Sequence, residues 1–202
     1  MSLRVEYWLS VASPWTWLGS ARFRELLART GARVELLPMD LSAVFAATGG
    51  TPFPQRSPAR QSYRQLELAR WSQTLGVPIT LSPRHYPVDR VPASCLLIAA
   101  GDAGLDTLAL SHAVLRAIWV EDRDIADWPT LTQLVNGLGH DGEALVKQAQ
   151  DPSAARRLEA NTQRAVQSGV FGAPTYIVDG ERFWGQDRLD FLEQLLEKRS
   201  AR

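Results

Sequence analysis

Cysteine and histidine are scarce in this sequence, and their scarcity excludes several kinds of site. Cys95 is the single cysteine among 202 residues, so neither an intrachain disulfide nor a cysteine-rich metal centre can form. The three histidines, at positions 85, 112 and 140, lack the spacing of a ligand set, and we expect no metal. Cys95 lies in a run of small and apolar residues, where we expect a buried helical residue and not a nucleophile.

Net charge and long apolar runs are also missing. The 22 basic and 22 acidic side chains cancel, and no dense basic face interleaved with aromatic residues is present, so we expect no nucleic-acid partner. No apolar run reaches the length of about 18 residues that a membrane span requires, and residues 1–10 lack the apolar core of a signal peptide. We therefore expect a soluble, cytoplasmic protein with no membrane partner.

The sequence does have enough apolar residues, 45% of the chain, for a sizeable core. Residues 3–9 alternate apolar and polar side chains, which predicts a strand. Ser13 and Pro14 then have the pattern of an N-cap and a first helical residue, and Gly31 ends the helix. Residues 33–38 form a second predicted strand, so the chain begins with a βαβ unit.

The middle of the chain, residues 40–169, has helical periodicity interrupted by glycine and proline. We expect helices near residues 59–75, 90–102, 106–120 and 152–168. Residues 79–81 are a weak strand candidate, and residues 49–58 are a loop of the kind that often lines a ligand site.

Strand patterns return after residue 169. Residues 175–178 and 182–184 predict a hairpin that turns at Asp179 and Gly180, and a leucine-rich helix follows. This order of elements predicts an α/β, thioredoxin-like fold with a large helical insertion. Residues 1–39 and 170–202 would form the discontinuous thioredoxin-like domain, and residues 40–169 the insertion.

Four stretches of sequence carry a resemblance to a known family. They are Ser-Pro-Trp-Thr-Trp-Leu at 13–18, Arg-Trp with Gly-Val-Pro at 70–78, Val-Phe-Gly-Ala-Pro-Thr at 170–175 and Phe-Trp-Gly-Gln-Asp-Arg-Leu at 183–189. Together they resemble the 2-hydroxychromene-2-carboxylate isomerases, which are similar to kappa-class glutathione transferases and to the DsbA-like thioredoxin superfamily. The resemblance spans essentially the whole chain. It implies a DsbA-like fold, glutathione as cofactor, a homodimer and a role in aromatic hydrocarbon catabolism.

Ser13 is the candidate catalytic residue. A serine that follows a strand and begins a helix sits at the positive end of the helix dipole, a position that favours an anion such as a thiolate. The resemblance implies that Ser13 holds the sulfur of glutathione as thiolate. Alternatively Ser13 is only a helix cap, worth about 1 kcal/mol. Because Ser13 and Thr16 occupy the positions of a Cys-X-X-Cys motif, dithiol exchange is excluded.

The last two motifs are candidate glutathione-binding segments. Ala173 resembles the residue before a cis-proline, whose backbone pairs with an extended thiol peptide; an ordinary trans-proline is the alternative. The resemblance implies that Trp184, Gly185, Gln186 and Asp187 bind the γ-glutamyl end, with Asp187 pairing with its ammonium group. Alternatively Asp187 caps the following helix. Gln186 stands where the family often has asparagine.

Substrate contacts are implied for residues after the second strand and in the insertion. They are Phe45, Gln55, Arg56, Arg60 and Tyr86. The two arginines have the chemistry to bind an aromatic carboxylate, although solvated surface arginines are an open alternative. Phe45 stands where characterised isomerases carry a lysine.

The resemblance implies cis–trans isomerisation of an aromatic-degradation intermediate through transient addition of the glutathione thiol. Trp15 and Trp17 are candidates for an aromatic wall of the substrate site, or for core packing. Two other functions stay open: a kappa-like glutathione transferase or peroxidase acting on another electrophile, which Phe45 favours, and a non-catalytic glutathione-binding module.

Overall fold

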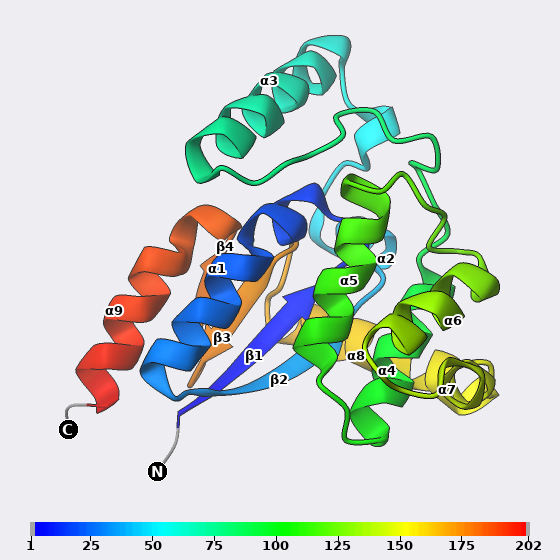
Figure 1. The fold of residues 1–202 in the computed structure, drawn as a ribbon. Coiled ribbons are helices and arrows are strands. Elements are labelled where there is room, and N and C mark those ends of the chain that lie inside the picture. Colours follow the sequence, from blue (N-terminus) through cyan, green and yellow to red (C-terminus); the bar gives the residue numbers. More distant parts are fainter. Residues whose placement is uncertain (1–2, 201–202) are drawn as a thin grey trace.

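A mixed sheet forms the centre of the computed structural model, which describes residues 3–200 (Figure 1). Its strands are β1 Arg4–Leu9, β2 Arg33–Pro38, β3 Thr175–Val178 and β4 Glu181–Trp184. They lie in the order β2-β1-β3-β4, with β1 and β2 parallel and the other neighbours antiparallel. The predicted βαβ unit and the late hairpin are therefore confirmed, and they form one sheet because β1 pairs with both.

Helices and short 3-10 turns fill the rest of the described chain. They are α1 Pro14–Thr30, α2 Leu41–Thr48, η1 Phe53–Gln55, α3 Pro58–Leu75, α4 Val91–Asp102, α5 Thr107–Trp119, α6 Trp128–Gly137, α7 Gly142–Ala149, α8 Pro152–Gln167, η2 Gln186–Arg188 and α9 Leu189–Ser200. The helices predicted from the sequence are present, each within a residue or so of its expected end. Three short helices, α2, α6 and α7, were not predicted, and residues 79–81 do not form a strand.

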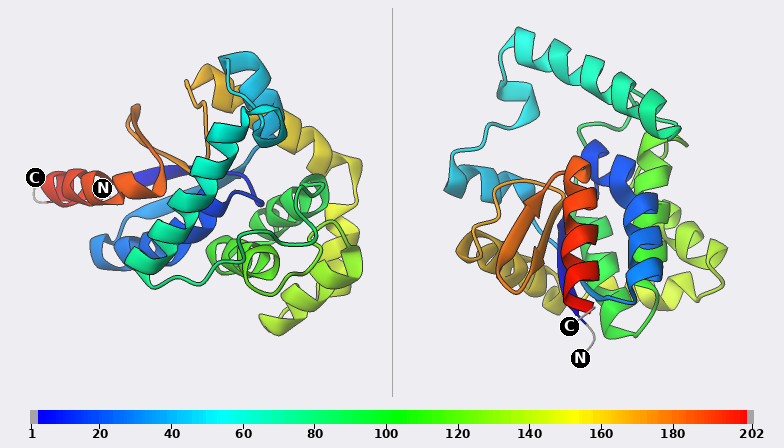
Figure 2. Two further views of the ribbon diagram at one scale, coloured as in Figure 1. Left: turned by 90° about the horizontal axis from the view of Figure 1, so that it is seen from above. Right: turned by 90° about the vertical axis from the view of Figure 1, so that its left-hand side faces the viewer.

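Alternating side chains of β1 supply the core on both faces of the sheet, as the period of a strand requires. On the face covered by α1 and α9, the Tyr7 ring stacks on Tyr176 with centroids 5.2 Å apart and packs against Phe23 at 4.6 Å. On the other face, Trp8 is buried with Val44 of α2 and Ala165 of α8. The two views of Figure 2 show these helices on opposite sides of the strands.

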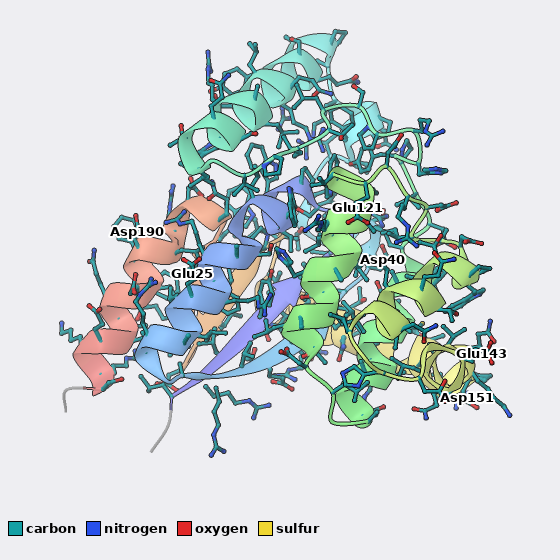
Figure 3. All side chains as sticks on the ribbon, in the orientation of Figure 1. Glu25, Asp40, Glu121, Glu143, Asp151 and Asp190 are labelled. Atoms are coloured by element: carbon teal, nitrogen blue, oxygen red, sulfur yellow. The ribbon has the colours of Figure 1, made fainter. Side chains whose placement is uncertain are left out.

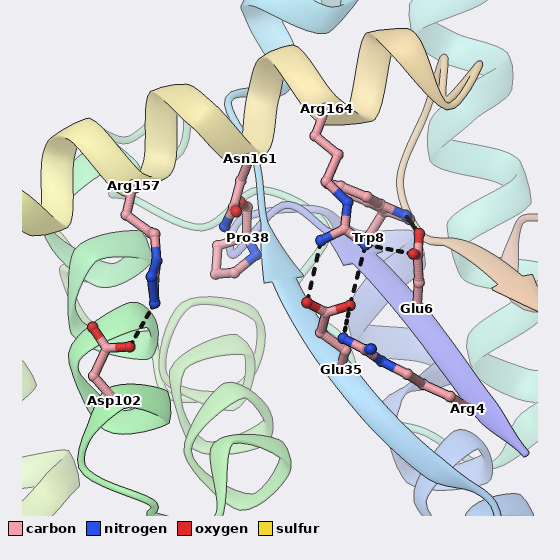
Figure 4. Close-up of polar contacts among 9 residues, drawn as sticks. All are labelled: Arg4, Glu6, Trp8, Glu35, Pro38, Asp102, Arg157, Asn161 and Arg164. Atoms are coloured by element: carbon pink, nitrogen blue, oxygen red, sulfur yellow. Dashed lines mark hydrogen bonds and ion pairs between the residues drawn. The ribbon is translucent and has the colours of Figure 1, made fainter.

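Helix α8 is tied to the sheet by an ion-pair cluster, drawn in Figure 4. The Arg164 guanidinium donates to both carboxylate oxygens of Glu35 on β2, each at 3.2 Å, and also to Glu6 on β1. The same guanidinium lies over the Trp8 ring, 5.2 Å from its centroid. A single side chain of α8 thus bridges the two parallel strands, because it binds one glutamate on each of them.

A second group of helices, α4 to α7, packs beside the sheet. Cys95 lies in α4 with 3% of its surface exposed, and burial, with a smaller contribution from Asp89, raises the pKa of its thiol. The expectation of a buried helical cysteine is confirmed. Within residues 3–200, no helix combines the length and apolarity needed to cross a membrane.

Helix α3 stands apart from the other helices, above the N-terminal end of α1 in Figure 1. Its C-terminal half contacts the body of the protein through Leu68 and Trp71, which pack on the main core cluster. The loops on either side of α3 return to α2 and to α4. The boundaries 1–39, 40–169 and 170–202 stay a prediction; α2 and α8, near the two ends of the predicted insertion, both pack on the sheet.

Candidate functional site

A cavity of about 580 Å³ lies between the N-terminus of α1, the segment before β3, η2 and the underside of α3. Its size falls within the usual range of small-molecule sites. Its lining residues are Ser10, Ala12, Ser13, Pro14, Trp15, Leu41, Ser42, Phe45, Pro52, Phe53, Pro54, Arg56, Arg60, Arg64, Glu67, Trp71, Tyr86, Pro87, Val88, Arg90, Gly172, Ala173, Trp184, Gly185, Gln186, Asp187 and Arg188. Segments from both ends of the chain and from its middle therefore meet at one place.

Ser13 lies on the cavity wall with only 5% of its surface exposed. It is the N-cap of α1, because its Oγ accepts a hydrogen bond from the N–H of Thr16 at 3.2 Å. The Ser13 hydroxyl donates to the carbonyl oxygen of Ala173 at 3.3 Å. Pro14 has no N–H, and the N–H of Trp15 has no partner within residues 3–200. The helix dipole and this open donor make the position favourable for an anion.

The peptide bond between Ala173 and Pro174 is cis, so the alternative of an ordinary trans-proline is wrong. The Pro174 carbonyl accepts from the N–H of Gly185 at 2.9 Å, and the Thr175 hydroxyl donates to the Gly172 carbonyl at 2.8 Å. These bonds fix the loop on both sides of the proline, with Ala173 facing the cavity beside Ser13.

Two glycines shape the loop that carries the last motif. Gly185 has φ +99, and a Cβ there would lie 2.4 Å from Asp187 Oδ1. A Cβ on Gly172 would lie 2.3 Å from the Trp184 indole nitrogen. Only glycine permits both the backbone conformation at Gly185 and the close approach of Trp184. The shape of the cavity edge at η2 therefore depends on glycine at both positions.

Asp187 and Gln186 lie at the cavity edge in different ways. The Asp187 carboxylate pairs with Arg188 at 2.7 Å, and it makes no side-chain bond to a backbone N–H within residues 3–200. The Gln186 side chain is 2% exposed, and its Oε1 accepts from Arg22 at 3.3 Å. Arg22 also pairs with Asp190 at 2.7 Å, the residue labelled on α9 in Figure 3. Gln186 thus anchors η2 to α1.

The predicted substrate residues do not all lie on the cavity wall. Phe45, Arg56, Arg60 and Tyr86 line the cavity, whereas Gln55 is exposed at the end of η1 and does not. Tyr86 also precedes a second cis-proline, which was not predicted. The expectation that these residues share a site is consistent with four of the five positions, and Gln55 is the exception.

The two tryptophans of the first motif lie in different environments. Trp15 lines the cavity, whereas Trp17 is 5% exposed in the core and donates from its indole nitrogen to the Pro78 carbonyl at 2.8 Å. Of the two, only Trp15 is therefore placed to contact a ligand.

Several lining residues were not found from the sequence. Arg64, Phe53 and Trp71 are the most informative of them. Arg64 stands four residues after Arg60, a helical spacing that places both on one face of α3. Burial lowers the pKa of Arg64, and a smaller effect in the same direction comes from the charge of Arg56. The spacing of four residues between Arg60 and Arg64 was the sequence signal that could have identified Arg64 as a lining residue.

Known proteins resemble this chain over almost its whole length. A 2-hydroxychromene-2-carboxylate isomerase of Sphingobium xenophagum is 29% identical over 197 residues, 97% of this chain and 99% of the relative. Glutathione S-transferase kappa 1 of Caenorhabditis elegans is 24% identical, over 96% of this chain and 91% of the relative.

Among solved structures, a 2-hydroxychromene-2-carboxylate isomerase superposes with a TM-score of 0.85 at 25% identity, covering 97% of this chain and 95% of the other. The family model of the DSBA-like thioredoxin domain matches residues 4–197. The thioredoxin-like, DsbA-like fold predicted from the sequence is confirmed, and the chain belongs to the DSBA-like thioredoxin domain family.

Proposed function

We propose that this protein is a glutathione-dependent isomerase that acts on an aromatic, unsaturated carboxylate of the 2-hydroxychromene-2-carboxylate type. The observation that carries the proposal is the position of Ser13. Its hydroxyl is buried at the N-terminus of α1, faces the carbonyl of Ala173 across the cavity wall, and shares that cavity with several arginines. The names of the relatives, isomerases and kappa-class glutathione transferases, support the same chemistry.

The residues present fit a bound thiol peptide. Ser13 has one hydroxyl proton, which it donates to Ala173 over a long 3.3 Å contact, and this proton can be redirected to a sulfur. Next to it, the unpartnered N–H of Trp15 and the dipole of α1 favour a negative charge. When bound, glutathione would supply a thiolate that adds reversibly to the substrate double bond, leaving a single bond that can rotate.

The chain's own residues then have separate tasks. Ser13 donates a hydrogen bond that favours the thiolate over the thiol and so lowers the thiol pKa. Asp187 offers a carboxylate for the ammonium group of the γ-glutamyl end, in exchange for part of its contact with Arg188. Arg56 and Arg60 draw a carboxylate toward the same cavity. Trp15 provides a flat apolar surface beside the cap.

A transferase or peroxidase acting on another electrophile is the second candidate, and one observation favours it. Phe45 lines the cavity and packs against Gly50, where an added Cβ would lie 2.3 Å from the Phe45 ring. An apolar ring at this point of the wall suits a more apolar electrophile than a charged side chain would. This candidate keeps the proposed tasks of Ser13 and Asp187 unchanged.

Two measurements on the same samples test the proposal. Ultraviolet difference titration follows glutathione thiolate in the wild type and in Ser13→Ala, and an isomerisation assay with 2-hydroxychromene-2-carboxylate follows turnover. Thiolate near neutral pH together with turnover supports the isomerase. Thiolate without turnover supports the transferase, and absence of glutathione binding leaves Ser13 as a helix cap and overturns both. A cytoplasmic location and a homodimer are further parts of the proposal, to be tested by fractionation and by light scattering.

A further inference from the structure

Arg64 is a buried cation that no acidic group of the described chain neutralises. Only 7% of its surface is exposed, although it lies on α3, a helix that is otherwise mostly exposed. Within residues 3–200 it has no hydrogen-bond or ion-pair partner. Arg64 lines the cavity, and none of its nitrogens is among the fully buried atoms that lack a partner within residues 3–200, so its N–H donors are open to a ligand from the cavity. Burial also lowers the pKa of Arg64, and an anion at this position would counter that effect by favouring the charged form.

Aromatic rings fix the orientation of this guanidinium. Its central carbon lies 4.2 Å from the centroid of Phe53, on η1, and 5.5 Å from that of Tyr86, in the loop after α3. Both distances are typical of cation–π contacts. Such contacts satisfy the faces of the group and leave the N–H donors at its edge unused. Those donors suit the edge-on, bidentate binding of a carboxylate.

The other charged side chains of the cavity either have partners or are more exposed. Glu67 pairs with Arg70, Asp187 with Arg188 and Arg90 with Asp40. Arg56 is partly exposed and donates to the Thr51 carbonyl at 2.9 Å. Arg60 is exposed. Water and salt weaken what an exposed arginine contributes, so the buried Arg64 dominates the discrimination between charged and neutral ligands.

We infer that Arg64, seated on Phe53 and Tyr86, is the residue that selects a carboxylate-bearing electrophile for this cavity, and that its ligand is a planar aromatic carboxylate. Arg56 and Arg60 then attract the anion and Arg64 binds it. The inference deepens the proposed function and rests on it for the substrate class. It does not depend on glutathione, since the arginine and its two rings lie on the α3 side of the cavity, and Ser13 and Asp187 come from other segments.

The test compares a carboxylate with its neutral isostere, on the full chain and without glutathione. Cinnamate and cinnamamide have the same ring and double bond and differ in charge. By isothermal titration calorimetry, the wild type should bind cinnamate about tenfold more tightly or better, the usual value of a charge-assisted bidentate contact. Arg64→Gln should lose most of this preference, keeping only the smaller part that Arg56 and Arg60 contribute. Arg60→Gln should reduce the preference by a smaller factor.

Matched variants separate binding from folding. Arg156→Gln removes the same charge from an exposed position on α8 outside the cavity lining, and it should keep the full preference. If Arg64→Gln does not fold, Arg64→Lys keeps the charge and the apolar stem while losing the bidentate fork, and it should keep only part of the preference. Near-ultraviolet circular dichroism checks the fold of each variant.

The outcomes distinguish this inference from the proposed function. A wild type without preference for cinnamate, or an Arg64→Gln variant that retains it, overturns the inference. Glutathione binding measured on the same samples tests the proposed function separately, because Ser13 is unchanged in every variant. Carboxylate selection without glutathione binding would support the inference and overturn the isomerase proposal. Glutathione binding without carboxylate selection would overturn the inference and leave the proposed binding of glutathione standing.

Discussion

The hydroxyl of Ser13 donates to the carbonyl oxygen of Ala173 at 3.3 Å, across 160 positions of sequence. The contact joins the start of α1 to the cis-proline loop, and it places the helix N-terminus against a segment whose backbone is held by the sheet. The same hydroxyl oxygen accepts from Thr16. Ser13 is thus at once a helix cap and part of the cavity wall.

Replacing Ser13 separates its two tasks. Ser13→Ala should lower the free energy of unfolding by about 1 kcal/mol, the usual value of an N-cap, and it should also move the thiol pKa of bound glutathione back toward about 8.5. Thermal unfolding and ultraviolet thiolate absorbance measure the two effects.

Asp141 provides the control for Ser13. It caps α7 by accepting from Ala144 at 3.0 Å, and it does not line the cavity. Asp141→Ala should therefore cost similar stability with no change in thiolate. A thiolate that persists unchanged in Ser13→Ala would remove Ser13 from the chemistry.

Asp187 should contribute to glutathione affinity and not to thiolate formation. Asp187→Asn removes the charge that would face the γ-glutamyl ammonium, and we expect affinity to fall by about tenfold, the value of a hydrogen bond to a charged group. At saturating glutathione the thiolate pKa should not change. Asp102→Asn, which removes the charge of an exposed ion pair with Arg157 outside the cavity, is the control and should bind glutathione normally.

Gly185 should be intolerant of any side chain. Its φ of +99 strains an L-residue, and a Cβ, 2.4 Å from Asp187 Oδ1, would displace that carboxylate from its place at the cavity edge. With ψ at 152 the residue lies in a region that essentially only glycine adopts, so Gly185→Ala should cost about 2 kcal/mol of stability and should weaken glutathione binding. Gly180, with φ +84 and nothing within 4 Å of its added Cβ, isolates the backbone effect. If Gly180→Ala weakens glutathione binding equally, displacement of Asp187 is not the cause of the loss.

Acid should loosen the attachment of α8 through Glu35. Burial raises the pKa of Glu35, but the bonds and charges of Arg164 and Arg4 outweigh it, so the pKa is lowered overall. The ion pair therefore stabilises the fold fully above the unfolded pKa of about 4.3 and is lost as pH falls through the lower folded value. Glu35→Gln should be less stable at neutral pH by on the order of 1 kcal/mol.

The acid dependence is the diagnostic part of this prediction. Stability measured by urea unfolding below about pH 4.3 should fall less in Glu35→Gln than in the wild type. Glu159→Gln changes an exposed carboxylate on the same helix and should leave the acid dependence as it is. Equal acid sensitivity in Glu35→Gln and the wild type would contradict the assignment.

The sequence was most informative where local patterns and the fold agree. The period of β1 and the cap at Ser13 predict their elements because each depends on neighbouring residues only. The short helices α2, α6 and α7 were missed, although each begins at a capping aspartate, Asp40, Asp127 or Asp141. Helices of this length owe their stability to packing, which a local pattern does not carry.

The candidate site was only partly predictable for a related reason. Arg56 and Arg60 were candidates because the family resemblance places them near a substrate-contacting stretch. Arg64 looks from the sequence like one more surface arginine, since charged residues are seldom buried. Its burial depends on Phe53 and Tyr86, from segments on either side of α3. Contacts between such separate segments form only in the folded chain, so the local sequence pattern does not predict them.

The position of β1 in the sheet has a consequence for the newly synthesised protein. β1 lies between β2 and β3, and β3 begins only at Thr175. While a ribosome produces the long helical segment, the central strand therefore keeps one hydrogen-bonding edge without its partner, next to the aromatic side chains of Tyr7 and Trp8. Unpaired strand edges of this kind are open to aggregation. We expect nascent chains to depend on a chaperone until the last strands emerge.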